Sequence, residues 1–265
     1  MTITDPRIDG GAPFDWGRVS AEYARSRDIY PPAFYDRLIR HGLCGDGCTL
    51  LDVGTGTAVL PRHLCRYGGR WVAADISPEQ IRFARALSAG LPIDCRVGAA
   101  ETLRFPDGTF DAITACQCLM YFDHDKAAPL FYRWLKPGGS LWFAYMAWLP
   151  AEDPIAGASE RLILRYSPQW SGANETPHPI DVPASYSSRF TPGFSEVVLL
   201  DVPFDRESWH GRVVACRAVG ASLPPKQLAA FEREHRALLA KIAPARFAVR
   251  HYAAFSEWKK PAQGG

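Results

Sequence analysis

The sequence lacks several features that would place it in a special class of protein. None of its seven cysteines lies in a Cys-x-x-Cys pair and the count is odd, so a disulfide framework is not indicated. Its longest apolar run, residues 141–149, is less than half the length of a membrane span. No block of Lys and Arg stands out, and the formal net charge is only +2. We therefore expect no membrane association and no partner, such as nucleic acid, that is held mainly by charge.

The composition and the N-terminus predict a cytoplasmic globular protein. Residues 1–6 are polar and acidic, whereas a secretory signal would be basic and then apolar. A content of 47% hydrophobic and 22% charged residues is ordinary for a globular chain and excludes the disordered and fibrous classes. A chain of 265 residues can form one large core. We expect a single domain over residues 1–265.

Residues 1–150 alternate between helical and strand patterns, which predicts a parallel sheet with helices on both faces. Helix starts are marked by Pro31-Pro32 and by Ser77-Pro78, the latter with an N-cap serine. A turn is expected at residues 136–139. The strands are expected at residues 49–53, 71–75, 93–97, 110–115 and 140–147.

The rest of the chain differs from residues 1–150 in its composition and residue pattern. Residues 150–194 are rich in Pro, Ser and aromatic residues and are too long for a simple connection, which predicts a lid or substrate loop. Helices are expected at 155–166, 206–219 and 225–242, and strands at 197–202 and 247–255. We expect N-terminal lid helices within 10–42 and substrate-cap segments at 150–194 and 205–243.

The strand at 49–53 leads directly into the loop Asp52-Val53-Gly54-Thr55-Gly56. Glycines allow the backbone to approach a ligand closely, and the helix that follows offers unpaired N–H groups. Asp75 ends the next strand, 75 − 54 = 21 residues after Gly54, where a carboxylate can bond both hydroxyls of a ribose. Val59 stands where a dinucleotide site would have a third glycine. A ribose-containing cofactor without a pyrophosphate is therefore favoured.

Leu51-Asp52-Val53-Gly54-Thr55-Gly56-Thr57 resembles the first motif of the class I S-adenosylmethionine-dependent methyltransferases. The similarity continues through Ala74–Ser77, Ala100–Asp107 with Phe110-Asp111, and Leu135–Gly139. Upstream, Phe14-Asp15, Tyr23-Ala24, Arg27 and Tyr30-Pro31 are also similar, so the resemblance covers residues 14 to 147. The order and spacing are similar to those of the type 11 branch, which includes quinone-biosynthesis and trans-aconitate-like enzymes.

This resemblance implies a fold, an activity and a cofactor. The fold is an α/β, Rossmann-like, doubly wound and mostly parallel seven-stranded sheet with an antiparallel last strand. A helical or loop lid would lie over the carboxyl ends of the strands. The activity is transfer of a methyl group from S-adenosylmethionine, with S-adenosylhomocysteine as the product.

By the same resemblance, the glycine loop would shape the pocket for the amino-acid part of the cofactor, and Asp75 would hold the ribose. The family often has an acidic residue at the position of Ala99, so the group that bonds the adenine amino group stays open, with Glu101 a second choice. The full set of expected cofactor-binding residues is Tyr23, Arg27, Asp52, Gly54, Thr55, Gly56, Asp75, Ile76, Ala100, Glu101, Cys116 and Gln117.

Methyl transfer requires a nucleophile held about 3–3.5 Å from the methyl group and in line with the leaving sulfur. A base is needed only if the acceptor loses a proton, so the catalytic residue stays open, with His124, His178 and His210 as candidates. Aromatic side chains near strand ends would offer flat apolar walls to an acceptor. The expected substrate-binding residues are Tyr30, Tyr121, Tyr145, Trp148 and Trp170.

Three alternatives remain at this point. Arsenite methyltransferases bind the metalloid through thiolates, but Cys44, Cys48, Cys116 and Cys118 follow no ligand spacing, and no metal site is expected. Nucleic-acid amino-methyltransferases tend to carry an Asn- or Asp-Pro-Pro-aromatic sequence where residues 115–118 stand, so a small-molecule acceptor is favoured. A third alternative is a non-catalytic domain that senses the cofactor or scaffolds a partner. The methylated atom (N, O or C), the acceptor and the oligomeric state are not indicated.

Overall fold

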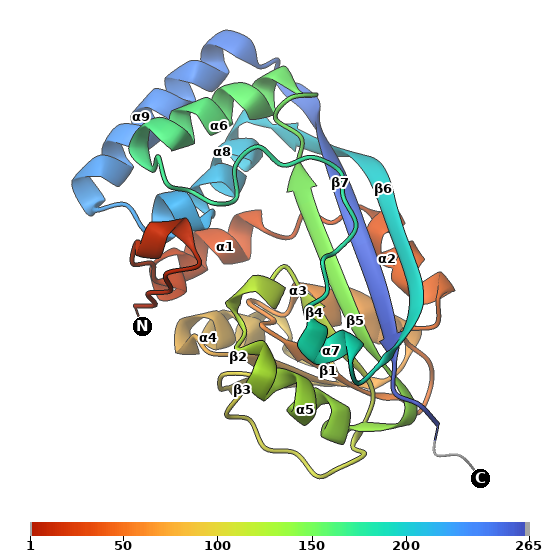
Figure 1. Ribbon diagram of the computed structural model, residues 1–265. Coiled ribbons are helices and arrows are strands. Elements are labelled where there is room, and N and C mark those ends of the chain that lie inside the picture. Colours follow the sequence, from red (N-terminus) through yellow and green to blue (C-terminus); the bar gives the residue numbers. More distant parts are fainter. Residues whose placement is uncertain (1, 263–265) are drawn as a thin grey trace. The chain divides into compact units, whose positions relative to one another are not determined.

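The computed structural model describes residues 2–262, and seven strands within them form a sheet with the order β3-β2-β1-β4-β5-β7-β6 (Figure 1). Strands β1 to β5 pair in parallel: β1 with β2 and β4, β2 with β3, and β4 with β5. The chain therefore moves outward from β1 in one direction and then in the other. The strands are β1 Thr49–Val53, β2 Arg70–Asp75, β3 Ile93–Val97, β4 Phe110–Cys116, β5 Leu135–Trp148, β6 Thr191–Asp205 and β7 Arg246–Lys259.

Strand β7 runs antiparallel to β5. The Gly138 N–H donates to Lys260 O at 3.1 Å, and the Lys260 N–H donates to Gly139 O at 2.9 Å. Farther along β5, the Leu149 N–H donates to Arg250 O at 2.9 Å. Residue numbers therefore increase along β5 while those of their partners decrease, as in an antiparallel pair. The predicted doubly wound, mostly parallel seven-stranded sheet with an antiparallel last strand is confirmed.

The helices begin where the sequence signals place them. Proline occupies the first turn of α2, α4, α6 and α9, where its missing N–H would have no partner in the helix. The Ser77 side chain accepts a hydrogen bond from the Gln80 N–H and so caps α4. The α-helices are α1 Ser20–Ser26, α2 Pro32–Arg40, α3 Val59–Leu64, α4 Pro78–Leu87, α5 His124–Trp134, α6 Pro154–Tyr166, α7 Ala184–Ser187, α8 Arg206–Val214 and α9 Pro225–Ile242.

Helices cover both faces of the parallel strands. On one face, Ile81 and Ala84 of α4 pack in a buried cluster with Ala73 of β2. On the other face, Phe131 of α5 belongs to the large cluster that contains Ala74 of β2. Because neighbouring residues of a strand point to opposite faces, α4 and α5 lie on opposite sides of the sheet. The apolar runs of β1 and β4 are buried between these layers.

Two predicted boundaries are wrong. Residues 136–139 were expected to form a turn, but they belong to β5, and Gly138 and Gly139 pair with Lys260, the residue directly after β7. A turn signal such as Pro-Gly-Gly is local, whereas this pairing is formed by residues more than 100 positions away. The helix expected at 206–219 ends at Val214 and is followed by a π-helix at Arg217–Ala221. Cys216 interrupts the helix because its backbone is extended, with ψ 152°.

The described chain divides into two compact units. Unit 1 contains residues 2–29, 147–177 and 199–252, and unit 2 contains residues 30–146, 178–198 and 253–262. Strands β1 to β4 lie in unit 2, whereas α1, α6, α8 and α9 lie in unit 1. Of the predicted lid and cap segments, 205–243 falls in unit 1 and the other two are divided between the units. Their role as a lid stays a prediction.

Unit 1 has a polar core beneath its helices. α6 and α9 lie side by side (Figure 1), and Ser159 of α6 accepts a hydrogen bond from the indole N–H of Trp209 at 3.0 Å. His235 of α9 lies 3.0 Å from the same hydroxyl through Nε2 and 2.9 Å from His210 Nδ1 through its own Nδ1. These side chains are at most 3% exposed. The buried polar groups are therefore satisfied within the unit.

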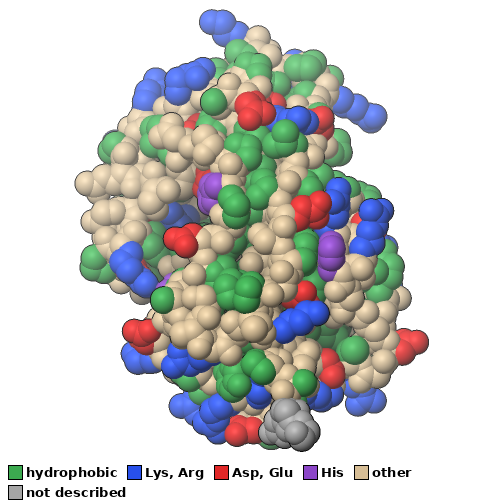
Figure 2. Space-filling view, turned by 45° about the vertical axis from the view of Figure 1, so that its right-hand side comes forward, with side chains coloured by type: hydrophobic (Ala, Val, Ile, Leu, Met, Phe, Trp, Pro, Cys, Tyr) green, Lys and Arg blue, Asp and Glu red, His purple; other side chains and the backbone are tan. Residues whose placement is uncertain are grey.

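The charge on one face and the hydropathy of the helices can be described directly. On the face drawn in Figure 2, Lys and Arg side chains lie among acidic and apolar ones and form no continuous basic surface. Within residues 2–262, no helix combines the length and the apolar character that crossing a membrane requires.

Candidate functional site

The loop after β1 has the backbone that its glycines permit. Gly54 and Gly56 have φ values of +64° and +58°, in the left-handed region that side chains disfavour. The Thr55 N–H donates to Ala74 O at 3.0 Å and so fastens the loop to the end of β2. A Cβ added to Gly54 would lie 2.7 Å from Cys118. Glycine is thus required at position 54 both by the backbone angle and by the Cys118 side chain packed against it.

Asp75 ends β2 beside this loop, and its carboxylate is held by two backbone donors. Oδ2 accepts the Gly56 N–H at 2.9 Å, and Oδ1 accepts the Ser77 N–H at 2.8 Å. Burial raises the pKa of Asp75, and these two hydrogen bonds oppose the shift. Each carboxylate oxygen can accept a second hydrogen bond. The group is oriented and keeps acceptor capacity for ligand hydroxyls.

Asp52 lies under the loop and is 2% exposed. Its Oδ2 accepts the Thr55 hydroxyl and its Oδ1 accepts the Thr114 hydroxyl of β4, each at 2.6 Å. Burial raises the pKa of Asp52 to about 7, the two hydroxyls oppose this, and the charge of Asp75 adds to it. Asp52 does not cap the next helix, because α3 begins after Ala58. It connects β1, the loop and β4.

The end of β4 brings three more residues to the same edge. Gln117 has a φ of +63°, which is unusual for a residue with a side chain, and its N–H donates to Ala144 O at 2.9 Å. Its side-chain amide donates to Met146 O of β5. This bend brings Cys118 under the loop, where its thiol donates to Val53 O at 3.1 Å. The Cys116 thiol donates to the Tyr30 hydroxyl at 3.5 Å.

The segment after β3 is attached to Asp75 through the backbone, since the Gly98 N–H donates to Asp75 O at 2.9 Å. Ala100 is 6% exposed, and none of the backbone hydrogen bonds found outside helices and strands in residues 2–262 uses its N–H. Glu101 Oε1 accepts the Asp123 N–H at 2.9 Å. Glu101 is therefore partly committed to the start of α5, which weakens it as a partner for an adenine amino group.

Known proteins match this part of the chain. Residues 51–143 match the family described as "Methyltransferase domain". Residues 51–143 are therefore similar to a methyltransferase domain. The ubiquinone biosynthesis O-methyltransferase of Xanthomonas axonopodis pv. citri is 32% identical over 130 residues, 46% of this chain and 53% of that protein. A methyltransferase-like protein of Schizosaccharomyces pombe, described as uncharacterized, is 28% identical over 136 residues, 51% of each chain. The chain thus spans about half the length of these curated relatives.

Solved structures resemble more of the chain. The YcgJ protein of Bacillus subtilis has a TM-score of 0.52 and 18% identity, and covers 86% of this chain and 98% of its own. The [4+2]-cyclase SpnF has a TM-score of 0.52 and 20% identity, and covers 87% of this chain and 80% of its own. At such identities the likeness shows the fold. A cyclase among these structures illustrates that fold alone does not decide the reaction.

The other predicted site residues of unit 2 are Tyr30, Ile76, Tyr121, His124, Tyr145 and His178. Tyr30, which meets Cys116, stacks on Phe34 with ring centroids 4.3 Å apart. Tyr121 and Tyr145 are partly buried, and Ile76 is partly exposed beside Asp75. His124 begins α5 with its Nδ1 3.4 Å from the buried Tyr186 hydroxyl. His178 is exposed, and its Nδ1 lies 2.7 Å from Pro179 O.

The remaining predicted residues belong to unit 1. Tyr23 lies on α1 and Arg27 directly follows this helix, with the guanidinium 5.1 Å from the tyrosine ring centroid. Trp148 is 4% exposed, donates to Glu160 at 2.8 Å and lies 5.8 Å from Trp170 between ring centroids. Burial lowers the pKa of His210 to about 4, which makes it a weak base at neutral pH. Ligand contact by these residues stays a prediction.

The four cysteines named for the metalloid alternative do not all lie together. Cys48 directly precedes β1 and Cys116 ends β4. Because β1 and β4 are parallel, with Val53 opposite Ala115, the two residues lie at opposite ends of the strands. Burial raises the pKa of Cys44 to about 12, so it is a thiol at neutral pH. Within residues 2–262 no group of three or more His, Cys, Asp or Glu side chains could hold a metal ion.

Sequence reasoning missed two residues that shape the loop. Thr114 bonds Asp52, and Cys118 fills the space beside Gly54. Thr114 carries the single hydroxyl within the otherwise apolar residues 112–115, and this isolated polar group was a signal in the sequence. Nothing local signalled Cys118, because its contact depends on the left-handed bend at Gln117.

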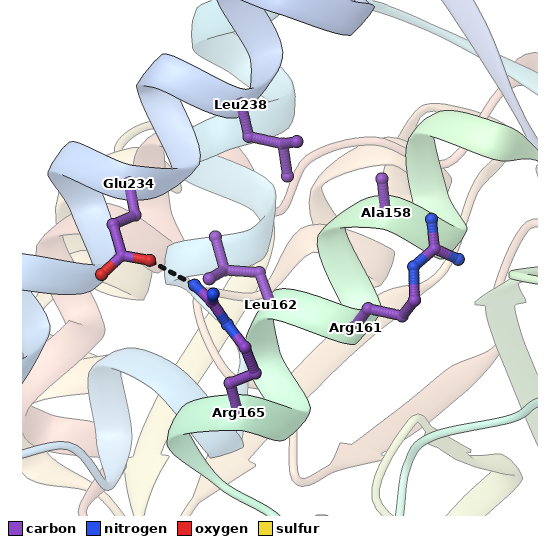
Figure 3. A pocket seen from close by; sticks show the side chains of 6 residues that line it. All are labelled: Ala158, Arg161, Leu162, Arg165, Glu234 and Leu238. Atoms are coloured by element: carbon purple, nitrogen blue, oxygen red, sulfur yellow. Dashed lines mark hydrogen bonds and ion pairs between the residues drawn. The ribbon is translucent and has the colours of Figure 1, made fainter.

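A groove of about 240 Å³ lies elsewhere, between α6 and α9 of unit 1. Figure 3 shows the Arg165–Glu234 ion pair crossing it, with Leu162 and Leu238 nearby. Its lining includes none of the predicted site residues. The residues that line it are Ala158, Arg161, Leu162, Arg165, Glu234 and Leu238.

Proposed function

We propose that this chain transfers a methyl group from S-adenosylmethionine to a small-molecule acceptor. The observation that carries the proposal is the Asp75 carboxylate, which Gly56 and Ser77 hold beside the glycine loop with acceptor capacity remaining. The site lies at the carboxyl ends of β1, β2 and β4, where the strand order reverses and open α/β sheets bind their ligands.

The residues present fit the chemistry of this cofactor. The Asp75 carboxylate can accept hydrogen bonds from two ribose hydroxyls, and the Ala100 N–H is suited to an adenine nitrogen. The left-handed backbone at Gly54–Gly56 would accommodate the methionine part. Val59 in place of a third glycine disfavours a dinucleotide. When bound, S-adenosylmethionine supplies a methyl group that is already activated on a sulfonium.

The protein's part in the reaction is then positioning and exclusion of water. Tyr30, Tyr121 and Tyr145 would form the wall that orients the acceptor in line with the methyl group. The relatives named as O-methyltransferases make an oxygen acceptor the first class to test. For such an acceptor, His124 is the candidate base, since its ring is anchored by the Tyr186 hydroxyl. We further propose that the protein acts in the cytoplasm and without nucleic acid.

Calorimetry followed by a turnover assay tests this function. The purified chain should bind S-adenosylmethionine and S-adenosylhomocysteine, and should transfer labelled methyl from the former into a small-molecule fraction of cell extract. Nucleic acid and arsenite serve as comparison acceptors. Binding with no transfer to any fraction would favour the non-catalytic alternative. Absence of binding would overturn the proposal.

A further inference from the structure

Two carboxyl groups, Asp52 under the glycine loop and Asp75 beside it, lack a positive partner within residues 2–262. Asp75 is the last residue of β2, and Asp52 is the second-to-last residue of the adjacent parallel strand β1. The negative charge of one carboxylate makes ionisation of the other less favourable. The donors to Asp52 are two neutral hydroxyls, and those to Asp75 are two backbone N–H groups. Within residues 2–262, no Lys, Arg or His side chain pairs with either carboxyl. A buried carboxylate in this setting is stabilised by a proton or by a cationic ligand.

The hydrogen bonds around Asp52 accommodate both protonation states. In the ionised state, the Thr55 and Thr114 hydroxyls both donate to the carboxylate. The Thr114 oxygen also lies 3.4 Å from Leu51 O. When Asp52 carries a proton, the carboxyl can donate to the Thr114 oxygen while the Thr114 hydroxyl turns toward Leu51 O. Neither state leaves a hydroxyl hydrogen without an acceptor.

The groups that face Asp52 come from three elements. Thr55 belongs to the loop, Thr114 to β4 and Asp75 to β2. The Cys118 thiol, after β4, also interacts electrostatically with Asp52, and burial raises the pKa of Cys118 well above its usual value. Cys118 is therefore neutral near pH 7. Burial raises the pKa of Asp52 to about 7, which places its titration in the physiological range.

We propose that Asp52 is a proton-linked counter-charge: near neutral pH it is partly protonated in the free protein, and it releases this proton when a sulfonium cofactor binds, but not when the uncharged thioether product binds. The inference rests on the proposed function. On binding, the O–H bond of the carboxyl breaks, the electron pair stays on the carboxylate, and the proton passes to the buffer. The site therefore favours the charged cofactor over its product as pH rises.

Calorimetric titration in two buffers of different ionisation enthalpy tests this. S-adenosylmethionine should release about half a proton more than S-adenosylhomocysteine at pH 7, since a group with a pKa of about 7 is half protonated there. Both ligands carry the same α-amino group, so its titration cancels in the difference. The affinity for S-adenosylmethionine, relative to the product, should rise about tenfold from pH 6 to pH 8.

The variant Asp52→Asn keeps the side-chain shape and removes the titrating group. It should lose both the excess proton release and the pH dependence of the affinity ratio. The control Asp94→Asn removes an exposed carboxyl of β3 and should leave both unchanged. Binding of both ligands with equal proton release in the unmodified protein would overturn this inference and leave the proposed function standing. Failure of either ligand to bind would instead refute the proposed function.

Discussion

Replacing Asp52 with Asn should stabilise the ligand-free protein at alkaline pH. Burial raises the pKa of Asp52 from 3.8 to about 7, so the folded state holds a proton that the unfolded state releases between these values. The carboxyl's contribution to stability is therefore complete below about pH 4 and falls as pH rises to about 7. Three pKa units correspond to at most about 4 kcal/mol. Asn remains neutral throughout and avoids this loss.

Urea unfolding at pH 4.5, 6 and 8 measures the effect. The variant should gain stability over the unmodified protein progressively with pH, with the largest difference at pH 8 and the smallest, about 1 kcal/mol, at pH 4.5. Asp94→Asn, at an exposed carboxyl paired with Arg96, should show no such trend. If Asp52→Asn is less stable than the unmodified protein at pH 8, the ionised carboxylate is a structural group and the reasoning fails.

Three further predictions concern other parts of the fold. Burial lowers the pKa values of His210, His235 and His251. The free energy of unfolding should therefore fall as pH drops below about 6.5, by about 1.4 kcal/mol per pH unit for each histidine. Urea unfolding in the Asp52→Asn background isolates this slope, and a flat profile would contradict it. Arg217→Ala leaves Asp9 buried without its cation and should cost about 3 kcal/mol, whereas Arg133→Ala, in an exposed pair with Asp107, should cost less than about 1 kcal/mol in the same assay; equal losses would refute the distinction. Gly54→Ala adds a close contact with Cys118 to the backbone strain, whereas Gly138→Ala, at φ +77° with open space around it, adds strain alone. The melting temperature should therefore fall further for Gly54→Ala. Equal falls would show that the Cys118 side chain moves aside to make room.

Much of the fold could be predicted because its signals are local. The parallel strands alternate with helices whose starts carry proline or an N-cap, and β1, β3 and α4 lie where these patterns placed them. The antiparallel last strand followed from the family resemblance. The residues at 136–139 could not be placed from sequence, because their strand pairing depends on β7, far along the chain.

The site was predictable in its motif and less so in its packing. The spacing in the sequence predicted the glycine loop and Asp75, and in the structure the Gly56 N–H donates a hydrogen bond to the Asp75 carboxylate. The contact between Cys118 and Gly54 arises from the left-handed backbone at Gln117, which no residue type there signals. The protonation of Asp52 depends on burial and on Asp75, neither of which can be read from the residue alone.

The affinity of Asp75→Asn for S-adenosylhomocysteine tests the central claim most directly. The variant keeps the shape of the side chain but weakens its hydrogen bonds to ribose hydroxyls, so the dissociation constant should rise at least about tenfold, equivalent to about 1.4 kcal/mol. Circular dichroism should show an unchanged fold, and Asp94→Asn should bind normally. An unchanged dissociation constant in the Asp75 variant would mean that this carboxylate does not hold the cofactor's ribose.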